Sequence, residues 1–478
     1  MLIEVIPRCG SRDKMSPDLG YTRYMRINRK IFHAYDVRGV YPNEIDAVIA
    51  RQLGAGYAEF ARRRFGAASP RIFVARDVRV SSEILRQGLI EGLIGAGADC
   101  IDLGITTEPQ AIFAVATTKR AEAAIMITAS HNPPQYNGFK FYLRGGIEIG
   151  LEGGLLEVAE LAERPALVRK AVKNIGTLEY DPGEVVRYIK RLHQLMPKLE
   201  ALRVVIDAGG GSAGFLLPRL LERYPIFYKP LNFQPDGTFR RHSPNPLNPA
   251  VADLMQRELT DGRYQLGVAF DGDGDRAIFF DELGRRIRND VIFALLAAED
   301  LERRKGSRFV FELVHSRVLG LFLEAYGGKL YQSPVGGVYI QKEMERRRAR
   351  LGGELSGHIY HQELQNIDSG LYTMLRVFHL VAALHQPVSQ VIQHLQASAF
   401  SQKSIPASRP QKILKIIERK YLPRIVSRLD GLTVQYPDWW FNIRASNTEP
   451  IVRLTIEAET EDVLKAHQRE IESLINSL

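Results

Sequence analysis

Apolar residues along the chain fall into short runs of strand length, separated by longer stretches in which apolar positions recur with helical spacing. Residues 31–40, 72–77 and 123–127 are predicted strands. Helices are predicted at 43–64 and, opening on Ser81-Ser82-Glu83, at 81–97. Strands and helices in alternation predict a largely parallel sheet with helices packed over it. The first part of the chain is therefore predicted to be an α/β unit.

The same alternation resumes after residues 165–182, where the pattern loosens and a linker is predicted. Residues 204–214 form a strand that enters a glycine-rich turn and a helix, and residues 266–280 form two apolar runs around an acidic loop. A third unit is predicted within 289–314, where a helix precedes a strand, and a last unit from 398 to 478 ends in a helix. The apolar positions of that last helix, which we predict to be core, are Leu464, Ile471, Leu474 and Leu478.

Composition places the chain among ordinary soluble globular proteins, with 45% hydrophobic and 25% charged residues. A length of 478 residues suggests roughly three domains. The longest apolar run, 291–298, is far shorter than the roughly 20 residues that a membrane span needs, so no membrane association is expected. The first residues show no secretory cleavage pattern, and we expect residues 1–28 to be a flexible extension. Cys9 and Cys100 cannot build a disulfide framework, which indicates a cytoplasmic protein.

A formal net charge of +9 raises the question of nucleic-acid binding. The densest basic run, residues 346–350, follows the more acidic segment 341–345 in helical register and lacks interleaved aromatic residues. This pattern is typical of a solvated helix face. We therefore expect no nucleic-acid partner, since a small anionic substrate accounts for the charge equally well.

The loop after the strand 123–127 combines a nucleophile, a histidine and a lysine. Ser130 is expected in the tight turn at the end of this strand, where sheets of this kind present their chemistry. Pro133 and Pro134 restrict the backbone, and Asn137-Gly138 supplies a second turn before strand character resumes at 139–142. The sequence therefore predicts a rigid elbow that carries Ser130, His131 and Lys140.

Three carboxylates alternate with glycines in the loop Asp271-Gly-Asp-Gly-Asp275. Glycines let the backbone curl so that Asp271, Asp273 and Asp275 can converge on one hard cation. A calcium-binding EF-hand is the obvious alternative, but Arg276 occupies its glycine position and the flanks are β-like instead of helical. We expect a divalent metal site of another kind.

Gly209, Gly211 and Gly214 match the spacing of a dinucleotide-binding turn. The acid expected about 20 residues later, at the end of a second strand, is missing, because residues 225–229 run into Pro230. A tight strand-to-helix turn is the favoured interpretation, and nucleotide binding stays open as an alternative.

Two further loops combine several polar groups. Residues 352–358 (Gly-Gly-Glu-Leu-Ser-Gly-His) place a carboxylate and an imidazole among glycines, which can contact vicinal hydroxyls. Residues 444–450 (Arg-Ala-Ser-Asn-Thr-Glu-Pro) place a forked cation beside neutral donors, which suits phosphate.

These four motifs, in this order, resemble those of the α-D-phosphohexomutase family, whose pattern includes T-x-S-H-N-P-x-x-x-N-G-x-K, D-G-D-G-D-R, G-E-x-S-G-H and R-x-S-x-T-E-P. Residues 35–39 also match its Y-D-x-R-G segment. The resemblance runs from Phe32 to the C-terminus and is strongest to mannose-specific and mannose/glucose dual-specificity members. It implies that Ser130 is the phosphoserine of the active enzyme and that the metal is Mg²⁺.

The resemblance also implies a role for each motif residue. The implied catalytic residues are Ser130, His131, Lys140 and Arg38. The implied metal ligands are Ser130, Asp271, Asp273 and Asp275. The implied substrate-binding residues are Tyr35, Arg276, Glu354, Ser356, His358, Arg444, Ser446, Asn447, Thr448 and Arg453.

The implied fold is α/β, with four domains around a central active-site cleft. The first three are similar units with mixed sheets and the fourth is a smaller α+β lid. The expected bounds are 29–177 for the phosphoserine domain, 178–288 for the metal-binding domain, 289–397 for the sugar-recognition domain and 398–478 for the phosphate-binding lid.

The implied activity is interconversion of hexose 6-phosphate and hexose 1-phosphate, for mannose or glucose, through hexose 1,6-bisphosphate as intermediate and activator. A monomer or dimer is expected. Phosphoglucosamine mutase is the alternative within the family, and a metal-dependent phosphatase or a calcium-binding structural protein are alternatives from other classes. Two positions depart from the family pattern. Val314 stands where many members carry lysine, and Gly337 stands where some bacterial members carry histidine.

Overall fold

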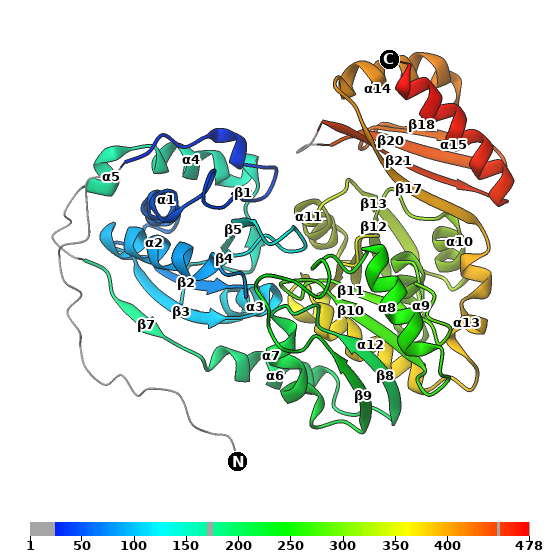
Figure 1. Cartoon of the computed structure of the whole chain (residues 1–478), viewed down its shortest axis with the longest axis horizontal. Coiled ribbons are helices and arrows are strands. Elements are labelled where there is room, and N and C mark those ends of the chain that lie inside the picture. Colours follow the sequence, from blue (N-terminus) through cyan, green and yellow to red (C-terminus); the bar gives the residue numbers. More distant parts are fainter. Residues whose placement is uncertain (1–23, 170–174, 447–449, 478) are drawn as a thin grey trace.

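The computed structural model describes residues 24–169, 175–446 and 450–477. They form four sheets, each with its own helices, and the C-terminal unit sits beside the third (Figure 1). The four-domain α/β architecture implied by the sequence is confirmed. Of the expected extension 1–28, residues 1–23 lie outside the described part. Residues 24–28 pack against the first unit, where Ile27 is buried and the Met25 N–H donates to Gln52 Oε1 at 2.9 Å.

The first sheet has seven strands and is mixed. In sheet order they are β1 (Val37–Val40), β5 (Tyr136–Leu143), β4 (Ala123–Ile127), β2 (Arg71–Arg76), β3 (Asp99–Ile105) and β7 (Leu178–Tyr180), with β6 (Ile147–Glu148) paired to β5. The pairs among β2, β3, β4 and β7 are parallel, whereas β5 is antiparallel to β4 and to β1. The predicted parallel sheet is therefore correct for only part of the unit, because the Ser130 elbow turns the chain back beside β4. β7 lies just beyond the boundary predicted at residue 177.

The helices of this unit are α1 (Ala47–Phe65), α2 (Ser82–Gly95), α3 (Glu108–Thr117), α4 (Leu156–Ala162) and α5 (Pro165–Arg169). α1 begins later than the predicted residue 43 because Asp46 caps it by accepting a hydrogen bond from the Ile49 N–H at 2.8 Å. The strand predicted at 31–40 is wrong in its first half. Residues Arg29–Ile31 form a 3₁₀ turn, and only β1 is a strand.

The second and third sheets are also mixed. The second has the order β11 (Ala277–Phe280), β10 (Leu266–Phe270), β8 (Leu202–Asp207) and β9 (Ile226–Leu231), with helices α6 (Glu184–Leu195), α7 (Ala213–Leu221) and α8 (Pro249–Leu259). The third has the order β13 (Lys329–Ser333), β12 (Arg308–Glu312), β14 (Leu351–Gly353), β15 (Ile359–His361) and β16 (Ile367–Asp368). Its helices are α9 (Asn289–Arg303), α10 (Arg317–Ala325), α11 (Gly337–Arg347), α12 (Gly370–Ala382) and α13 (Val388–Val391). In each sheet the last pairs are antiparallel hairpins, β10–β11 in one and β14–β15–β16 in the other.

The fourth sheet is antiparallel throughout. Its order is β17 (Ala399–Pro406), β21 (Ile451–Ala458), β20 (Trp439–Ala445), β19 (Leu432–Gln435) and β18 (Ile425–Ser427), covered by α14 (Pro410–Tyr421) and α15 (Glu461–Asn476). A buried carboxylate, Glu457, ties this unit to the third. It accepts hydrogen bonds from the Arg317 N–H at 2.9 Å and from the Ser316 hydroxyl at the start of α10.

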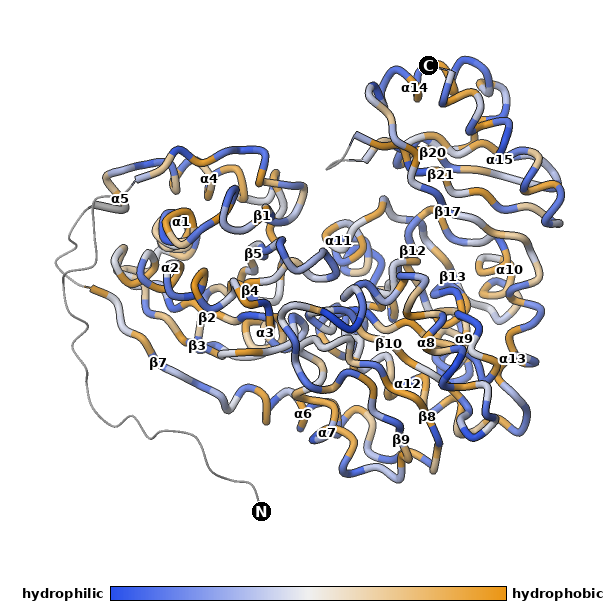
Figure 2. The backbone as a smooth tube through the Cα atoms, in the orientation of Figure 1, coloured by the Kyte–Doolittle hydropathy of each residue, from blue (hydrophilic) through white to orange (hydrophobic). Residues whose placement is uncertain are grey.

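The apolar core is shared by the first three units but not by the fourth. One buried cluster runs from Phe73 in the first sheet through β8 and β10 to Leu395. Figure 2 shows this region as predominantly hydrophobic along β8, β10 and α12. The buried cluster of the fourth unit contains only residues between Ile405 and Ile475. Within the described ranges, no helix has both the length and the apolar character to cross a membrane.

Candidate active site

The four sequence motifs meet in one cleft of about 860 Å³. This is within the usual size of a small-molecule site, roughly 300–1,000 Å³. The predicted site residues that line it are Tyr35, Arg38, Ser130, His131, Lys140, Arg276, Glu354, Ser356, His358, Arg444, Ser446 and Arg453. All four units therefore contribute side chains to the same cavity. Asn447 and Thr448 lie outside the described residues.

Ser130 occupies the turn between β4 and β5, as predicted. Its φ of 49° is left-handed, a conformation that non-glycine residues rarely adopt and that often marks a functional turn. Its hydroxyl lies 3.0 Å from Asp271 Oδ2, to which it donates, and 3.1 Å from His131 Nδ1. The elbow therefore brings the serine directly against the acidic loop of the second unit.

A buried arginine that the sequence reasoning missed holds this elbow in place. Arg79, 1% exposed, forms an ion pair with Asp77. Its guanidinium also donates to four backbone carbonyls of the loop, those of Ser130, Asn132, Pro133 and Tyr136, at 2.7–3.0 Å. The only local sequence feature that could have predicted this role was Asp77-Val-Arg79 directly after β2, and the same sequence is equally typical of a surface ion pair.

The acidic loop between β10 and β11 is fully buried at Asp271, Asp273 and Asp275. Asp271 Oδ1 accepts the backbone N–H of Gly274 at 3.0 Å, which curls the loop as its glycines allow. Burial, together with the negative charges of Asp275 and Asp273, raises the pKa of Asp271 well above its usual range. Packing three carboxylates this closely favours a bound cation.

The donor set fits a hard divalent cation. Asp273 Oδ1 and both carboxylate oxygens of Asp275 are buried with no hydrogen-bond partner in the described part of the chain. Two groups of side chains have ligand atoms within 4.8 Å of one another: Glu108, Asp273 and Asp275, and Asp275, His358 and Asp368. Asp275 belongs to both, whereas Asp271 belongs to neither and instead contacts Ser130.

Lys140 lies on β5 between these carboxylates. Its ammonium donates to Glu108 Oε2 and lies 3.5 Å from Asp275 Oδ2. Burial lowers the pKa of Lys140, but the charges of Glu108, Asp275 and Asp273 outweigh burial and hold this pKa well above its usual value. These ion pairs therefore favour the charged form of Lys140.

His131 has the opposite character. Burial and the neighbouring positive charges of Arg276 and Arg38 hold the pKa of His131 well below its usual range. Arg38 itself donates to Asn132 Oδ1 at 2.7 Å and pairs with Asp36. A neutral imidazole beside Ser130 can accept a proton, whereas the charged form of Lys140 cannot.

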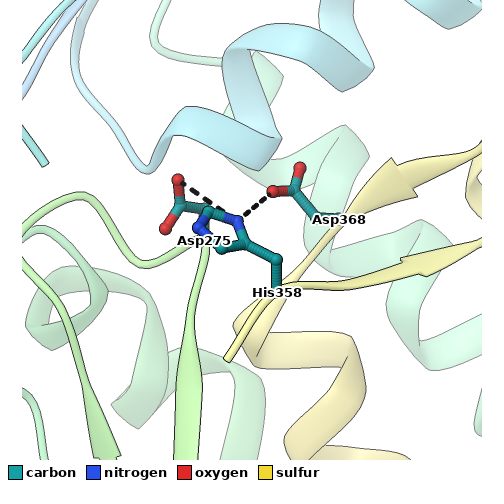
Figure 3. A group of neighbouring side chains, drawn as sticks. All are labelled: Asp275, His358 and Asp368. Atoms are coloured by element: carbon teal, nitrogen blue, oxygen red, sulfur yellow. Dashed lines mark hydrogen bonds and ion pairs between the residues drawn. The ribbon is translucent and has the colours of Figure 1, made fainter. Parts of the chain in front are cut away.

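The loop after β14 brings His358 to the acidic loop (Figure 3). Its Nδ1 lies 2.7 Å from Asp368 Oδ2 and 3.9 Å from Asp275 Oδ2. Because Arg276 Nε donates to His358 Nε2 at 2.8 Å, we assign the ring proton to Nδ1, which then donates to Asp368. Asp368 was not predicted, since it follows His358 by ten residues on a separate strand.

Glu354 and Ser356 line the same side of the cleft. Glu354 Oε1 accepts the Tyr360 hydroxyl at 2.8 Å, and the Ser356 hydroxyl is buried with no partner among the described residues. Two unpredicted carboxyls, Glu148 and Glu312, also line the cavity. Burial raises the pKa of each to about 8.

The fourth unit contributes Arg444 and Arg453 from paired positions of β20 and β21. Arg444 Nη1 lies 3.9 Å from Asp430 Oδ2. Tyr35 faces the third unit, where its ring meets that of Tyr339 edge-on at 6.5 Å. Arg444, Arg453 and Tyr35 all line the cleft.

Both departures from the family pattern, Val314 and Gly337, line the cleft. A Cβ atom added at Gly337 would lie 2.5 Å from the Tyr360 hydroxyl and 3.7 Å from Glu148 Oε2. Tyr360 therefore fills the space that a larger residue at position 337 would need.

The glycine-rich turn after β8 is the predicted strand-to-helix turn. The Ser212 N–H donates to the Gly272 carbonyl at 2.9 Å, and a Cβ atom at Gly211 would lie 2.8 Å from the Asp271 carbonyl. The turn supports the acidic loop from behind, which explains its glycine at position 211.

Comparison with known proteins agrees with this geometry. Family models described as phosphoglucomutase/phosphomannomutase α/β/α domains I, II and III match residues 29–161, 186–284 and 288–398, and the C-terminal domain model matches residues 407–474. A phosphomannomutase of Salmonella montevideo is 32% identical over 466 residues, which cover 94% of this chain and 100% of the relative. A phosphomannomutase/phosphoglucomutase of Pseudomonas aeruginosa is 30% identical, with 91% and 93% covered. The solved structure of a phosphoglucomutase/phosphomannomutase family protein from Burkholderia thailandensis has a TM-score of 0.84 at 30% identity, with 95% of this chain and 98% of that one covered. The chain therefore belongs to the phosphoglucomutase/phosphomannomutase family.

Proposed function

We propose that this protein interconverts a hexose 6-phosphate and a hexose 1-phosphate, with mannose or glucose as the sugar, through a phosphoserine at Ser130. The observation that carries the proposal is the position of the Ser130 hydroxyl, 3.0 Å from Asp271 Oδ2, in the cleft that Arg444 and Arg453 also line. The proposed phosphoryl carrier, Ser130, and the two arginines proposed to bind the second phosphate therefore line one cavity.

In the first step, the free hydroxyl of the substrate attacks the phosphorus of phosphorylated Ser130. The bond between phosphorus and Ser130 Oγ breaks, and hexose 1,6-bisphosphate forms. After the sugar turns over, its other phosphate returns to Ser130 in the reverse of this step. His131, held neutral beside Ser130, accepts the proton of the attacking hydroxyl and returns it, while Lys140, Arg38 and Arg276 supply fixed positive charge.

Asp271, Asp273 and Asp275 are the residues that would hold Mg²⁺, together with an oxygen on Ser130. This assignment is supported by the unpartnered oxygens of Asp273 and Asp275 and by the dense negative charge of the loop. When bound, the ion neutralises the charge that builds on the transferring oxygens. The protein residues then orient the phosphoserine and the sugar around it.

The opposite side of the cavity is suited to the sugar and to its second phosphate. Glu354, Ser356 and His358 are proposed to contact the hydroxyls. Arg444, Ser446 and Arg453, together with Asn447 and Thr448, are proposed to bind the phosphate that is not reacting. A monomer or dimer in the cytoplasm, with hexose 1,6-bisphosphate as activator, remains our prediction.

The test begins with Ser130. Protein incubated with glucose 1,6-bisphosphate should gain the mass of one phosphoryl group, and Ser130→Ala should abolish both this gain and turnover. Ser69→Ala, on the surface of the same unit, is the control and should behave as the wild type. An unmodified Ser130 with full turnover would refute the assignment.

A panel of mannose, glucose and glucosamine 1-phosphates then identifies the substrate. We expect the mannose and glucose 6-phosphates as products, without release of inorganic phosphate. A preference for glucosamine 1-phosphate would support the alternative within the family. Stoichiometric phosphate release would instead indicate a phosphatase.

A further inference from the structure

Glu108 is a buried carboxylate at the first position of α3 that neither the motifs nor the proposed reaction employ. It is 3% exposed and lines the cleft. Its two oxygens accept hydrogen bonds from different side chains, Oε2 from the Lys140 ammonium and Oε1 from the Tyr142 hydroxyl. Its position is therefore fixed from two sides.

The backbone around Glu108 is anchored to the acidic loop. The Glu108 N–H donates to the Asp273 carbonyl at 2.9 Å. A Cβ atom at Gly274 would lie 2.9 Å from the Thr107 side chain, which shows how closely the two segments pack. The start of α3 and the acidic loop thus form one rigid contact between the first two units. This contact fixes the distance of Glu108 from Asp273 and Asp275.

Lys140 has two carboxylates within reach. Its ammonium is hydrogen-bonded to Glu108 and lies 3.5 Å from Asp275 Oδ2. Asp275 is the carboxylate common to both groups that could hold a cation, and neither of its oxygens has a hydrogen-bond partner in the described segments. A lysine that moved onto Asp275 would compete with a metal ion for the same oxygens, because both are cations.

We propose that Glu108 is a positioning residue that holds the Lys140 ammonium off Asp275 and so keeps Asp275 free to bind a divalent cation. This inference rests on the proposed metal site. Tyr142 contributes to this positioning indirectly, because its hydroxyl donates to the second carboxylate oxygen of Glu108 and so fixes the rotation of the carboxylate.

The alternative is that Glu108 itself binds the metal, since it lies within 4.8 Å of Asp273 and Asp275. Both ideas predict weaker metal binding when the charge of Glu108 is removed. They differ in the role of Lys140. If Glu108 acts through the lysine, removing the lysine as well should restore metal binding, whereas a lost ligand cannot be restored in this way.

The experiment measures Mn²⁺ binding to the full-length protein by electron paramagnetic resonance of the free ion, without any substrate. The variants are Glu108→Gln, Lys140→Met, which keeps the apolar stem of the side chain, and the double variant. Glu184→Gln is the matched control, because Glu184 is also a buried carboxylate at the first position of a helix and is paired with an arginine.

We expect Glu108→Gln to weaken Mn²⁺ binding by about 10- to 100-fold, the usual effect of losing a residue that orients a metal ligand. Lys140→Met alone should bind Mn²⁺ at least as tightly as the wild type, because it removes a cation 3.5 Å from Asp275 Oδ2, and Glu184→Gln should bind as the wild type. The double variant should regain the affinity of Lys140→Met. Should Glu108→Gln fail to fold, Glu108→Asp, which keeps the charge on a shorter side chain, should show a smaller loss that Lys140→Met again cancels.

Wild-type affinity in Glu108→Gln, or weak binding that persists in the double variant, would overturn the inference. Failure of the wild type itself to bind Mn²⁺ would instead overturn the proposed metal site. The two failures are therefore distinguishable in one set of titrations.

Discussion

Arg79 offers the sharpest test of how the Ser130 elbow is held. In Arg79→Met, the carboxylate of Asp77 remains buried but loses its cation, and the carbonyls of Ser130, Asn132, Pro133 and Tyr136 lose their guanidinium donor. Removing one partner of a buried ion pair costs about 3–5 kcal/mol. Since domains are typically stable by only about 5–15 kcal/mol, this change should remove a large part of the stability of the first unit.

The assay is denaturant unfolding followed by circular dichroism, together with the extent of Ser130 phosphorylation by glucose 1,6-bisphosphate. Arg263→Met is the matched control. Arg263 repeats the local geometry of Arg79, because its N–H and Nε donate to an aspartate two residues earlier, Asp261, but it lies on the surface. Its replacement should leave the unfolding midpoint unchanged. If Arg79→Met unfolds at the same denaturant concentration as Arg263→Met and is phosphorylated normally, the buried arginine does not hold the elbow.

Three further predictions concern the other units. Arg444→Ala should lose about 1.5–3 kcal/mol of binding energy, roughly one to two decades in affinity, for both the hexose 1-phosphate and the hexose 6-phosphate. Weaker binding of only one of these substrates in steady-state assays would show two separate phosphate sites. Gly337→His should lower substrate affinity, because a Cβ atom at position 337 would lie 2.5 Å from the Tyr360 hydroxyl, and adding Tyr360→Phe should relieve part of this loss. An unchanged affinity in Gly337→His would show that Tyr360 does not limit the space at this position. Burial lowers the pKa of His242, but its bond to Asp207 outweighs burial and raises this pKa. The stability lost in His242→Gln should therefore be greatest below about pH 6.5 and shrink as the pH rises through the folded-state pKa. Unfolding curves in which the stability difference between wild type and variant widens with pH would refute this.

Features set by neighbouring residues in the chain could be predicted from the sequence. The strand Ala123–Ile127, the turn at Ser130 and the curled loop of Asp271, Asp273 and Asp275 follow from local spacing and the backbone preferences of proline and glycine. The strand predicted at 31–40 fails because Phe32 pairs with Val37 in an isolated bridge, so the chain doubles back where alternation alone suggested an extended run.

Partners contributed by distant parts of the chain could not be predicted. Glu108 meets Lys140 because α3 packs against β5 within the first unit, and His358 meets Asp275 because the second and third units pack together. A signal for Glu108 existed, since it follows β3 directly and the carboxyl ends of parallel strands gather at one edge of a sheet. The same signal marked Glu312, which is the last residue of the parallel strand β12, but no such signal marked Glu148, which lies on a two-residue antiparallel strand.

The separate hydrophobic cluster of the fourth unit has a consequence for the engineering of this protein. Its buried residues lie only between Ile405 and Ile475, and a single described passage of the chain, ahead of β17, leads into it. A junction at residues 396–398 would therefore fall between the shared cluster and that of the fourth unit, with Phe400 of β17 as the side chain that packs across it. A unit exchanged at this junction would need a carboxylate at position 457 to meet Ser316 and Arg317. Exchange at this junction would replace the Arg444 and Arg453 side of the cleft while leaving Ser130 and the acidic loop unchanged.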